Sequence, residues 1–225
     1  MNEPIVKAEG VATDVGAAEF FERARSRLRF DIPPGLTDAS VVPLTGDQGN
    51  DFMLQAIARE KRVRPAAVLI PVVAHDEPTV LLTQRSAHLN EHAGQIAFPG
   101  GKIDATDASP VDAALREAWE EVGLDRGHVE PIGYLDLYGT SFGFRILPTV
   151  ARVEPGFRLA VNAAEVDDVF EVPLSFLMNP LNHRMGQKEF RGMQRSFYEM
   201  PFAERYIWGA TAGILRALYE RIYLK

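Results

Sequence analysis

The chain has 225 residues, with 24 Lys and Arg against 31 Asp and Glu, and its formal net charge is −7. Its length predicts one domain with an extension or one large domain, and the absence of cysteine excludes a disulfide scaffold, a zinc–thiolate site and a thiol nucleophile. The lack of cysteine also suits a reducing, cytoplasmic compartment, and net acidity argues against non-specific nucleic-acid binding, which needs clustered Lys and Arg.

The N-terminal part of the sequence predicts an appendage. Met1 to Pro4 have neither the basic nor the apolar region of a secretory signal. Residues 17–28 have the apolar spacing of a short amphipathic helix, and residues 31–50 are rich in Pro and Gly, which predicts a loop. We therefore expect residues 1–60 to form a partly helical N-terminal extension and residues 61–225 to form the main domain.

The main domain alternates predicted strands and helices. The apolar run of residues 66–74 and the β-forming residues 79–83 predict two strands joined by a hairpin-like turn, and the first run is far below the about 20 residues of a membrane helix. Further strands are expected at 95–98, 129–137 and 144–153, then a loop at 155–169, a short helix at 173–178, a hairpin around Gly192 and a final helix over 206–223. Mixed strands flanked by helices predict an α/β or α+β layered domain.

The clearest helix is expected over residues 110–122. Ser109 can cap it, Pro110 occupies its first position, Asp112 completes a capping box and Gly123 ends it. Trp119 lies near the border of its apolar stripe, so we expect this side chain in the core.

Three glutamates lie within one turn of this helix. Glu117 and Glu121 are four residues apart and Glu120 is beside them, although like charges at this spacing cost a few tenths of a kcal/mol. A bound cation would explain the cluster, and hard ions such as Mg²⁺ or Mn²⁺ prefer oxygen ligands. The alternative is a solvated acidic face paired with Arg116 and Arg126.

These residues resemble the Nudix box, G-x5-E-x7-R-E-U-x-E-E-x-G-U. The matching residues are Gly101, Arg116-Glu117, Glu120-Glu121 and Gly123-Leu124. The first half departs from the pattern, because Ala108 stands where the box has Glu, and Asp107 is reached only by allowing one extra residue. The resemblance implies a Nudix fold, a mixed β-sheet sandwiched between helices.

An upstream stretch is similar to the motif of the coenzyme A pyrophosphatase branch of that family. It comprises Leu81–Ser86, Gly94 and Phe98–Gly101, and Asn90 stands where the pattern has Arg. The resemblance implies metal-dependent cleavage of coenzyme A or acyl-CoA to 3′,5′-ADP and 4′-phosphopantetheine. The alternatives are a Nudix hydrolase of another nucleoside diphosphate derivative, such as ADP-ribose, a dinucleotide or a nucleoside triphosphate, and a non-catalytic binding module.

Helix geometry and the family match together predict Glu117 and Glu121 as the main ligands of Mg²⁺ or Mn²⁺. Glu120 is a third ligand or a base, and the carbonyl of Gly101 can face the same ion. We expect Arg116 to orient a glutamate through a charge-assisted bond.

Three residues outside this set are further candidates. Glu165 is a candidate general base on a late loop, and Arg85 and Lys102 are candidate phosphate contacts. The expected partner is a small nucleotide substrate, with no nucleic acid and no membrane, and we allow for a homodimer.

Overall fold

The computed structural model describes residues 16–43, 45–46, 63–89, 91–140, 142–190 and 193–224. Four features of the sequence lie outside these residues: the segment Met1 to Pro4, the domain boundary expected near residue 60, Asn90, and Gly192 in the predicted hairpin.

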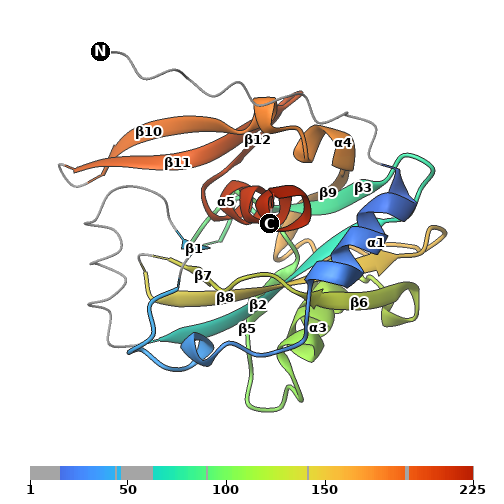
Figure 1. Cartoon of the computed structure of the whole chain (residues 1–225), viewed down its shortest axis with the longest axis horizontal. Coiled ribbons are helices and arrows are strands. Elements are labelled where there is room, and N and C mark those ends of the chain that lie inside the picture. The colour runs from blue at the N-terminus through green and yellow to red at the C-terminus, as the bar shows by residue number, and fades with distance from the viewer. Residues whose placement is uncertain are drawn as a thin grey trace.

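A mixed sheet forms the centre of the described part of the chain, where nine strands take part in it (Figure 1). The strands are β1 (Thr45–Gly46), β2 (Arg64–Val73), β3 (Thr79–Arg85), β4 (Ile96–Ala97), β5 (Gly100–Lys102), β6 (Val129–Tyr134), β7 (Tyr138–Gly139), β8 (Phe144–Val153) and β9 (Val166–Pro173). The parallel pair of β2 and β8 forms its middle. Strand β3 forms an antiparallel hairpin with β2, and it also pairs antiparallel with β9. Both middle strands are buried over most of their length because both faces of the sheet are covered.

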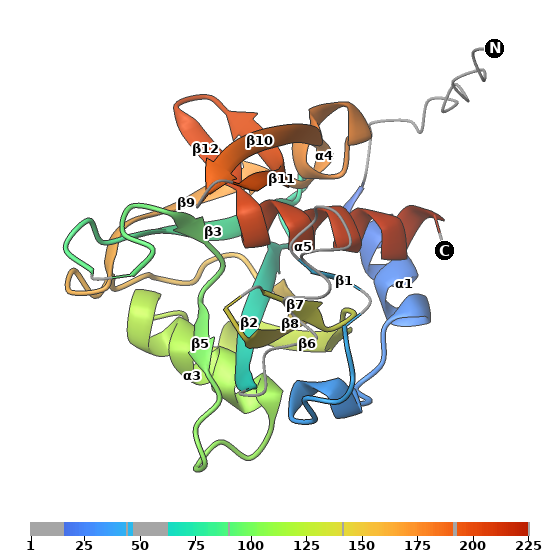
Figure 2. The same ribbon diagram turned by 90° about the vertical axis from the view of Figure 1, so that its left-hand side faces the viewer.

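Helices cover the two faces of this sheet (Figure 2). Helix α3 (Pro110–Val122) packs on one face through Ala113, Ala114, Ala118 and Val122. Helices α1 (Ala17–Arg27) and α5 (Gly209–Tyr219) share the core of the other face. The predicted mixed sheet sandwiched between helices is therefore confirmed.

A second, three-stranded antiparallel sheet lies beside α5. It consists of β10 (Arg184–Phe190), β11 (Met193–Phe202) and β12 (Arg205–Trp208). The final helix was expected from Tyr206, which is wrong: Tyr206 pairs with Pro201 of β11, and α5 begins at Gly209. Pairing with the strand just before them in the chain thus overrides the helical spacing of these residues.

The short elements connect these layers. They are the 3₁₀-helices Pro34–Leu36, Arg126–His128 and Pro180–Asn182, the helix α4 (Leu174–Leu177), and a π-helical turn, Glu220–Leu224, that continues α5. None of the helices in the described residues has the length and apolar character needed to cross a membrane.

The helix predicted over residues 17–28 is present as α1. Phe20 and Phe21 are buried in the same core as Leu218 and Ile222 near the chain's C-terminal end. The segment N-terminal to the main domain therefore contributes side chains to the domain's own core.

Candidate active site

Local signals place the acidic helix as the sequence predicts. The Ser109 Oγ accepts a hydrogen bond from the backbone N–H of Asp112 (3.2 Å) and donates one to its carboxylate (2.8 Å). Gly123 ends α3 with a φ of 68°, a left-handed conformation in which glycine is favoured. Helix α3 then presents its glutamates beside the double-glycine strand β5.

Glu121 is the buried member of the glutamate cluster. Its side chain is 3% exposed, and its Oε2 accepts a hydrogen bond from the backbone N–H of Gly100 (3.1 Å). Burial, together with the charges of Glu117 and Glu165, raises the pKa of Glu121 to about 7, against the opposing effects of this hydrogen bond and of Arg85. A carboxylate held in a buried position against backbone is poorly satisfied by protein alone, and a cation would stabilise it.

Glu117 lies against the other glycine. A Cβ added at Gly101 would come within 2.5 Å of the Cδ and Oε1 of Glu117, so only glycine leaves room for this carboxylate. Burial raises the pKa of Glu117, and the neighbouring Glu120 and Glu165 add to the effect, whereas Arg116 opposes it.

Arg116 connects the helix to the loop that precedes it. Its Nε and Nη2 donate to both carboxylate oxygens of Asp107 (2.9 and 3.1 Å), and its Nη1 donates to Glu117 (3.0 Å) and Glu120 (3.1 Å). The guanidinium fork matches the Asp107 carboxylate geometry, which leaves the remaining nitrogen directed at the glutamates. Asp107, which aligns with the first Glu of the Nudix box only if one extra residue is allowed, therefore pairs with Arg116, the arginine of the box.

The late loop brings Glu165 to the same place. The Glu165 carbonyl accepts a hydrogen bond from the backbone N–H of Ser86 (2.9 Å), directly after β3, and its charge raises the pKa of both Glu117 and Glu121. A carboxylate 44 positions after Glu121 in the chain is thus close enough to act on it electrostatically.

The two candidate phosphate contacts differ in their surroundings. Arg85 ends β3 at an irregularity in its pairing with β9, and its Nη1 lies 3.7 Å from the Glu121 Oε1, while its Nε is buried without a hydrogen-bond partner. Lys102 is exposed, and its backbone carbonyl accepts a hydrogen bond from Arg116 (3.2 Å). Of these two candidate phosphate contacts, only the side chain of Arg85 is thus in contact with the glutamate cluster.

The donor groups fit a hard divalent cation. Carboxylates gather on one side of α3 and raise one another's pKa, and the Gly101 carbonyl belongs to the strand they face. As they stand, no three acidic or imidazole groups among the described residues converge on a single point, because Arg116 and the Gly100 amide hold several of the oxygens. The chemistry of the donors therefore suits Mg²⁺ or Mn²⁺.

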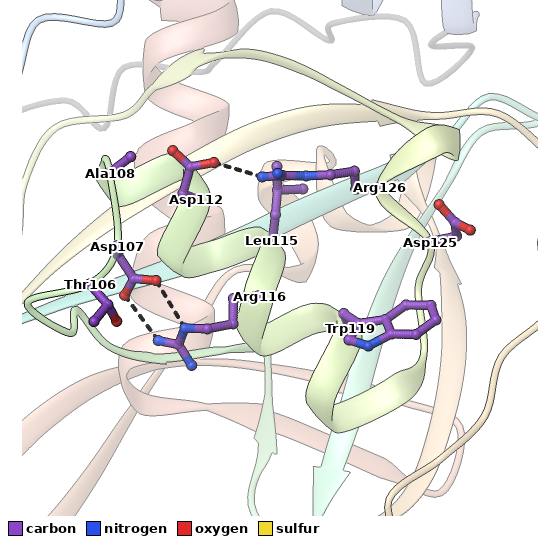
Figure 3. A pocket seen from close by; sticks show the side chains of 9 residues that line it. All are labelled: Thr106, Asp107, Ala108, Asp112, Leu115, Arg116, Trp119, Asp125 and Arg126. Carbon is purple, nitrogen blue, oxygen red and sulfur yellow. Dashed lines mark hydrogen bonds and ion pairs between the residues drawn. The ribbon is translucent and has the colours of Figure 1, made fainter.

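Trp119 is not in the core, and that prediction is wrong. Its side chain is 57% exposed and lines a hollow on the outer side of α3 with Leu115 and Arg126 (Figure 3). The sheet-facing stripe is occupied by Ala118 and Val122, so the residue after Ala118 is rotated about 100° away from the sheet. The ion pairs of Asp107 with Arg116 and of Asp112 with Arg126 border the same hollow.

Two residues near the site carried no signal in the sequence. Asn162 joins the Glu165 loop to the end of α3. Arg205 of β12 donates to Gln84 of β3 (2.7 Å) and pairs with Asp168 of β9. Both act through contacts between segments that are far apart in the sequence, which a linear motif does not record.

A helix-covered mixed sheet whose acidic helix faces a double-glycine strand defines the class of enzymes that cleave pyrophosphate bonds in nucleotide derivatives. The family model described as NUDIX domain matches residues 63–191, more than half of the chain, and the chain belongs to the Nudix family. Hydrolases of this family generally need divalent metal ions.

Two curated relatives are similar over most of their length. Nudix hydrolase NudL of Photorhabdus laumondii is 41% identical over 177 residues, which cover 77% of this chain and 95% of the relative. NudL of Escherichia coli strain K12 is 42% identical over 162 residues, 72% of this chain and 84% of that protein. Among solved structures, the Nudix hydrolase RenU from M. smegmatis aligns with a TM-score of 0.41 at 21% identity, over 48% of this chain and 70% of that one.

Proposed function

We propose that this Nudix hydrolase cleaves the pyrophosphate of coenzyme A or an acyl-CoA, giving 3′,5′-ADP and 4′-phosphopantetheine or its acyl derivative. The observation that carries the proposal is the position of Arg85, the arginine of the upstream motif, whose guanidinium lies 3.7 Å from the buried Glu121. A motif residue that reaches the glutamate cluster is in a position to contact the phosphates of a bound substrate.

In this proposal Glu117 and Glu121, with Glu120 and the Gly101 carbonyl, hold Mg²⁺ or Mn²⁺. When bound, such an ion would supply neutralisation of phosphate charge and a lowered pKa for a coordinated water molecule. Arg116 orients Glu117 through the contact at 3.0 Å, and Asp107 fixes the guanidinium from its other edge. Glu165 accepts the proton of the attacking water, and Arg85 and Lys102 contact the phosphates.

The second candidate is the same reaction on another nucleoside diphosphate derivative, such as ADP-ribose, a dinucleotide or a nucleoside triphosphate. The observation that favours it is Asn90, which stands where the coenzyme A motif has an arginine and so removes one positive charge from that motif. The variant Asn90→Arg tests this point: we expect a lower KM for coenzyme A, and an unchanged KM would exclude position 90 from substrate binding.

The deciding experiment compares turnover of coenzyme A, dephospho-coenzyme A and ADP-ribose with Mg²⁺, with Mn²⁺ and with EDTA. We expect metal-dependent cleavage of coenzyme A with a large preference over the other two, because the proposal includes recognition of the 3′-phosphate. Cleavage of dephospho-coenzyme A or ADP-ribose alone would discard the coenzyme A assignment and keep the pyrophosphate chemistry.

Three further features belong to the same proposal. We propose a cytoplasmic enzyme, a division into an N-terminal extension (residues 1–60) and a Nudix domain (residues 61–225), and a homodimer. Light scattering after size-exclusion chromatography tests the homodimer directly, and a mass near the 25.0 kDa of one chain would exclude it.

A further inference from the structure

Asn162 organises the turn that precedes β9. Its side-chain Oδ1 accepts a hydrogen bond from the backbone N–H of Ala164 (3.2 Å), and its carbonyl accepts from the N–H groups of Glu165 (3.0 Å) and Val166 (2.9 Å). This is the pattern by which an asparagine stabilises a turn through its own side chain.

The same residue attaches this turn to the acidic helix. The backbone N–H of Asn162 donates to the carbonyl of Glu121 (2.9 Å), and the N–H of Ala160 donates to the carbonyl of Val122 (2.9 Å). Carbonyls in the last turn of a helix lack partners within the helix, so the loop satisfies two of them. The turn is therefore attached to the end of α3 that carries Glu121.

The side-chain amide of Asn162 reaches the carboxylate of Glu165. Its Nδ2 donates to the Glu165 Oε1 at 3.2 Å. The orientation of the amide is determined by its partners, because the Ala164 N–H can only donate and the carboxylate can only accept. The Glu165 carbonyl in turn accepts from Ser86, so the backbone of Glu165 is held at the end of β3 while its side chain is held by Asn162.

We infer that Asn162 is a positioning residue for the reaction: it directs the Glu165 carboxylate toward the glutamates of α3. The inference deepens the proposed function, on which it rests for the role of Glu165. Without the amide donor, Glu165 keeps its backbone position and loses the contact that fixes its side-chain rotamer. Misplacement of a catalytic group by about 1 Å can cost about 100-fold in rate.

The variant Asn162→Asp removes the amide donor to Glu165 and keeps the side-chain oxygen that stabilises the turn. Aspartate keeps the oxygen that accepts from Ala164 and is well suited to such turns, but it cannot donate to Glu165. The matched control is Asn179→Asp, because the Asn179 Oδ1 accepts from the Leu181 N–H (3.0 Å) in an equivalent arrangement at the start of the 3₁₀-helix Pro180–Asn182.

We expect Asn162→Asp to lower kcat by about 10-fold or more, because a positioned base contributes about 10²–10⁴-fold to the rate. The KM should stay within about 2-fold of the wild-type value, and the Tm should equal that of the Asn179→Asp control. The assay uses whichever nucleoside diphosphate derivative the wild type cleaves best, so failure of coenzyme A as substrate does not affect it. A wild-type kcat in Asn162→Asp would overturn the inference.

A double-mutant cycle with Glu165→Gln tests whether Asn162 acts through Glu165. We expect Asn162→Asp to change kcat by less than about 2-fold in the Glu165→Gln background, since residues that act as a unit are non-additive. An undiminished effect there, or wild-type turnover of Glu165→Gln itself, contradicts the inference.

Hydrogen exchange of residues 162–166 in the metal-free protein gives a readout that does not depend on activity. Asn162→Ala should raise exchange of this turn, whereas Asn162→Asp should retain the wild-type rate. Exchange raised in Asn162→Asp as much as in Asn162→Ala would show that the substitution disrupts the turn itself, so that a loss of kcat would not report on the amide donor, and would overturn the inference.

Discussion

The carboxylate of Glu117 lies against the Cα of Gly101, where a Cβ would meet its Cδ at 2.5 Å. This contact joins the first glutamate of the acidic helix to the strand whose backbone it faces. Glycine is therefore required at position 101 by the space that Glu117 occupies. The placement of the Glu117 carboxylate can thus be tested by substituting Gly101, without altering any charged group.

Gly101→Ala should displace Glu117 and reduce turnover. The methyl group meets the end of a flexible side chain, so the protein can relax by moving the carboxylate, and we expect a loss of about 10–100-fold in kcat with less than about 1 kcal/mol lost from the free energy of unfolding. Steady-state kinetics and urea denaturation measure the two quantities. Gly16→Ala is the control, since a Cβ there meets nothing within 4 Å; equal turnover in both variants would contradict the prediction.

Glu121→Gln should abolish turnover and leave the fold intact. Glutamine has nearly the same volume and can still accept the hydrogen bond from Gly100, and removal of a buried charge is not destabilising in itself. We expect at least about a 100-fold loss of kcat with Mg²⁺ or Mn²⁺, because a negatively charged metal ligand is lost. Glu130→Gln, at an exposed glutamate that pairs with Arg25, is the control. Most of the activity remaining in Glu121→Gln would show that the proposed ligand set is wrong.

Asp107→Asn should weaken the anchor of Arg116. The Arg116 guanidinium, by its hydrogen bonds, holds the pKa of Asp107 below its usual range, so the folded state favours the ionised carboxylate. A lowered pKa stabilises the fold above the ordinary carboxyl pKa of about 4, and this stabilisation is lost as the pH falls below it. We expect a loss of about 1 kcal/mol at pH 7 that is smaller at pH 3, together with a lower kcat. Chemical denaturation at pH 3 and pH 7 measures this loss of unfolding free energy, with Asp76→Asn as an exposed control. A loss that is equal at the two pH values would exclude the ion pair as its cause.

Stability should also depend on pH near neutrality through His183. Its Nε2 donates to the Leu177 carbonyl (2.7 Å) and its Nδ1 faces Arg216 at 3.5 Å; burial, and then the charge of Arg216, lower its pKa. The unfolded chain therefore binds the proton more readily, and stability is lost as the pH falls below the ordinary histidine value of about 6.5. His183→Gln should reduce the change in unfolding free energy between pH 7.5 and pH 5.5. His88→Gln serves as a comparison, and an unaltered pH dependence in His183→Gln would contradict the assignment.

Features set by neighbouring residues could be predicted from the sequence. Helix α3 begins at Pro110 and ends at Val122 as expected, because its cap, its first-position proline and its terminal glycine all act within a few residues. The strand predicted over 144–153 matches β8 for the same reason, since the content of β-forming residues in a segment is a local property. The spacing of Glu117, Glu120 and Glu121 likewise follows from helix geometry alone.

Contacts between elements required the tertiary structure. The strand β12 replaces the first turn of the expected final helix because it pairs with β11, the preceding strand, and Trp119 faces solvent because of the way α3 is oriented on the sheet. Most of the candidate site also depends on contacts between elements. Glu121 accepts a hydrogen bond from the amide of Gly100 and pairs with Arg85 only when the sheet has formed. The charge of Glu165 acts on Glu121 only when the late loop is hydrogen-bonded to the end of α3.

The acidic helix and its carboxylates could therefore be predicted from the sequence, since they depend on periodicity and on residue spacing over one or two turns, and the family followed from the resemblance of the motifs. The tertiary structure alone decided which residues surround those carboxylates: Asp107 beside Arg116, and Asn162 between Glu121 and Glu165. These hydrogen bonds depend on how loops and whole elements pack against one another, which no local pattern encodes.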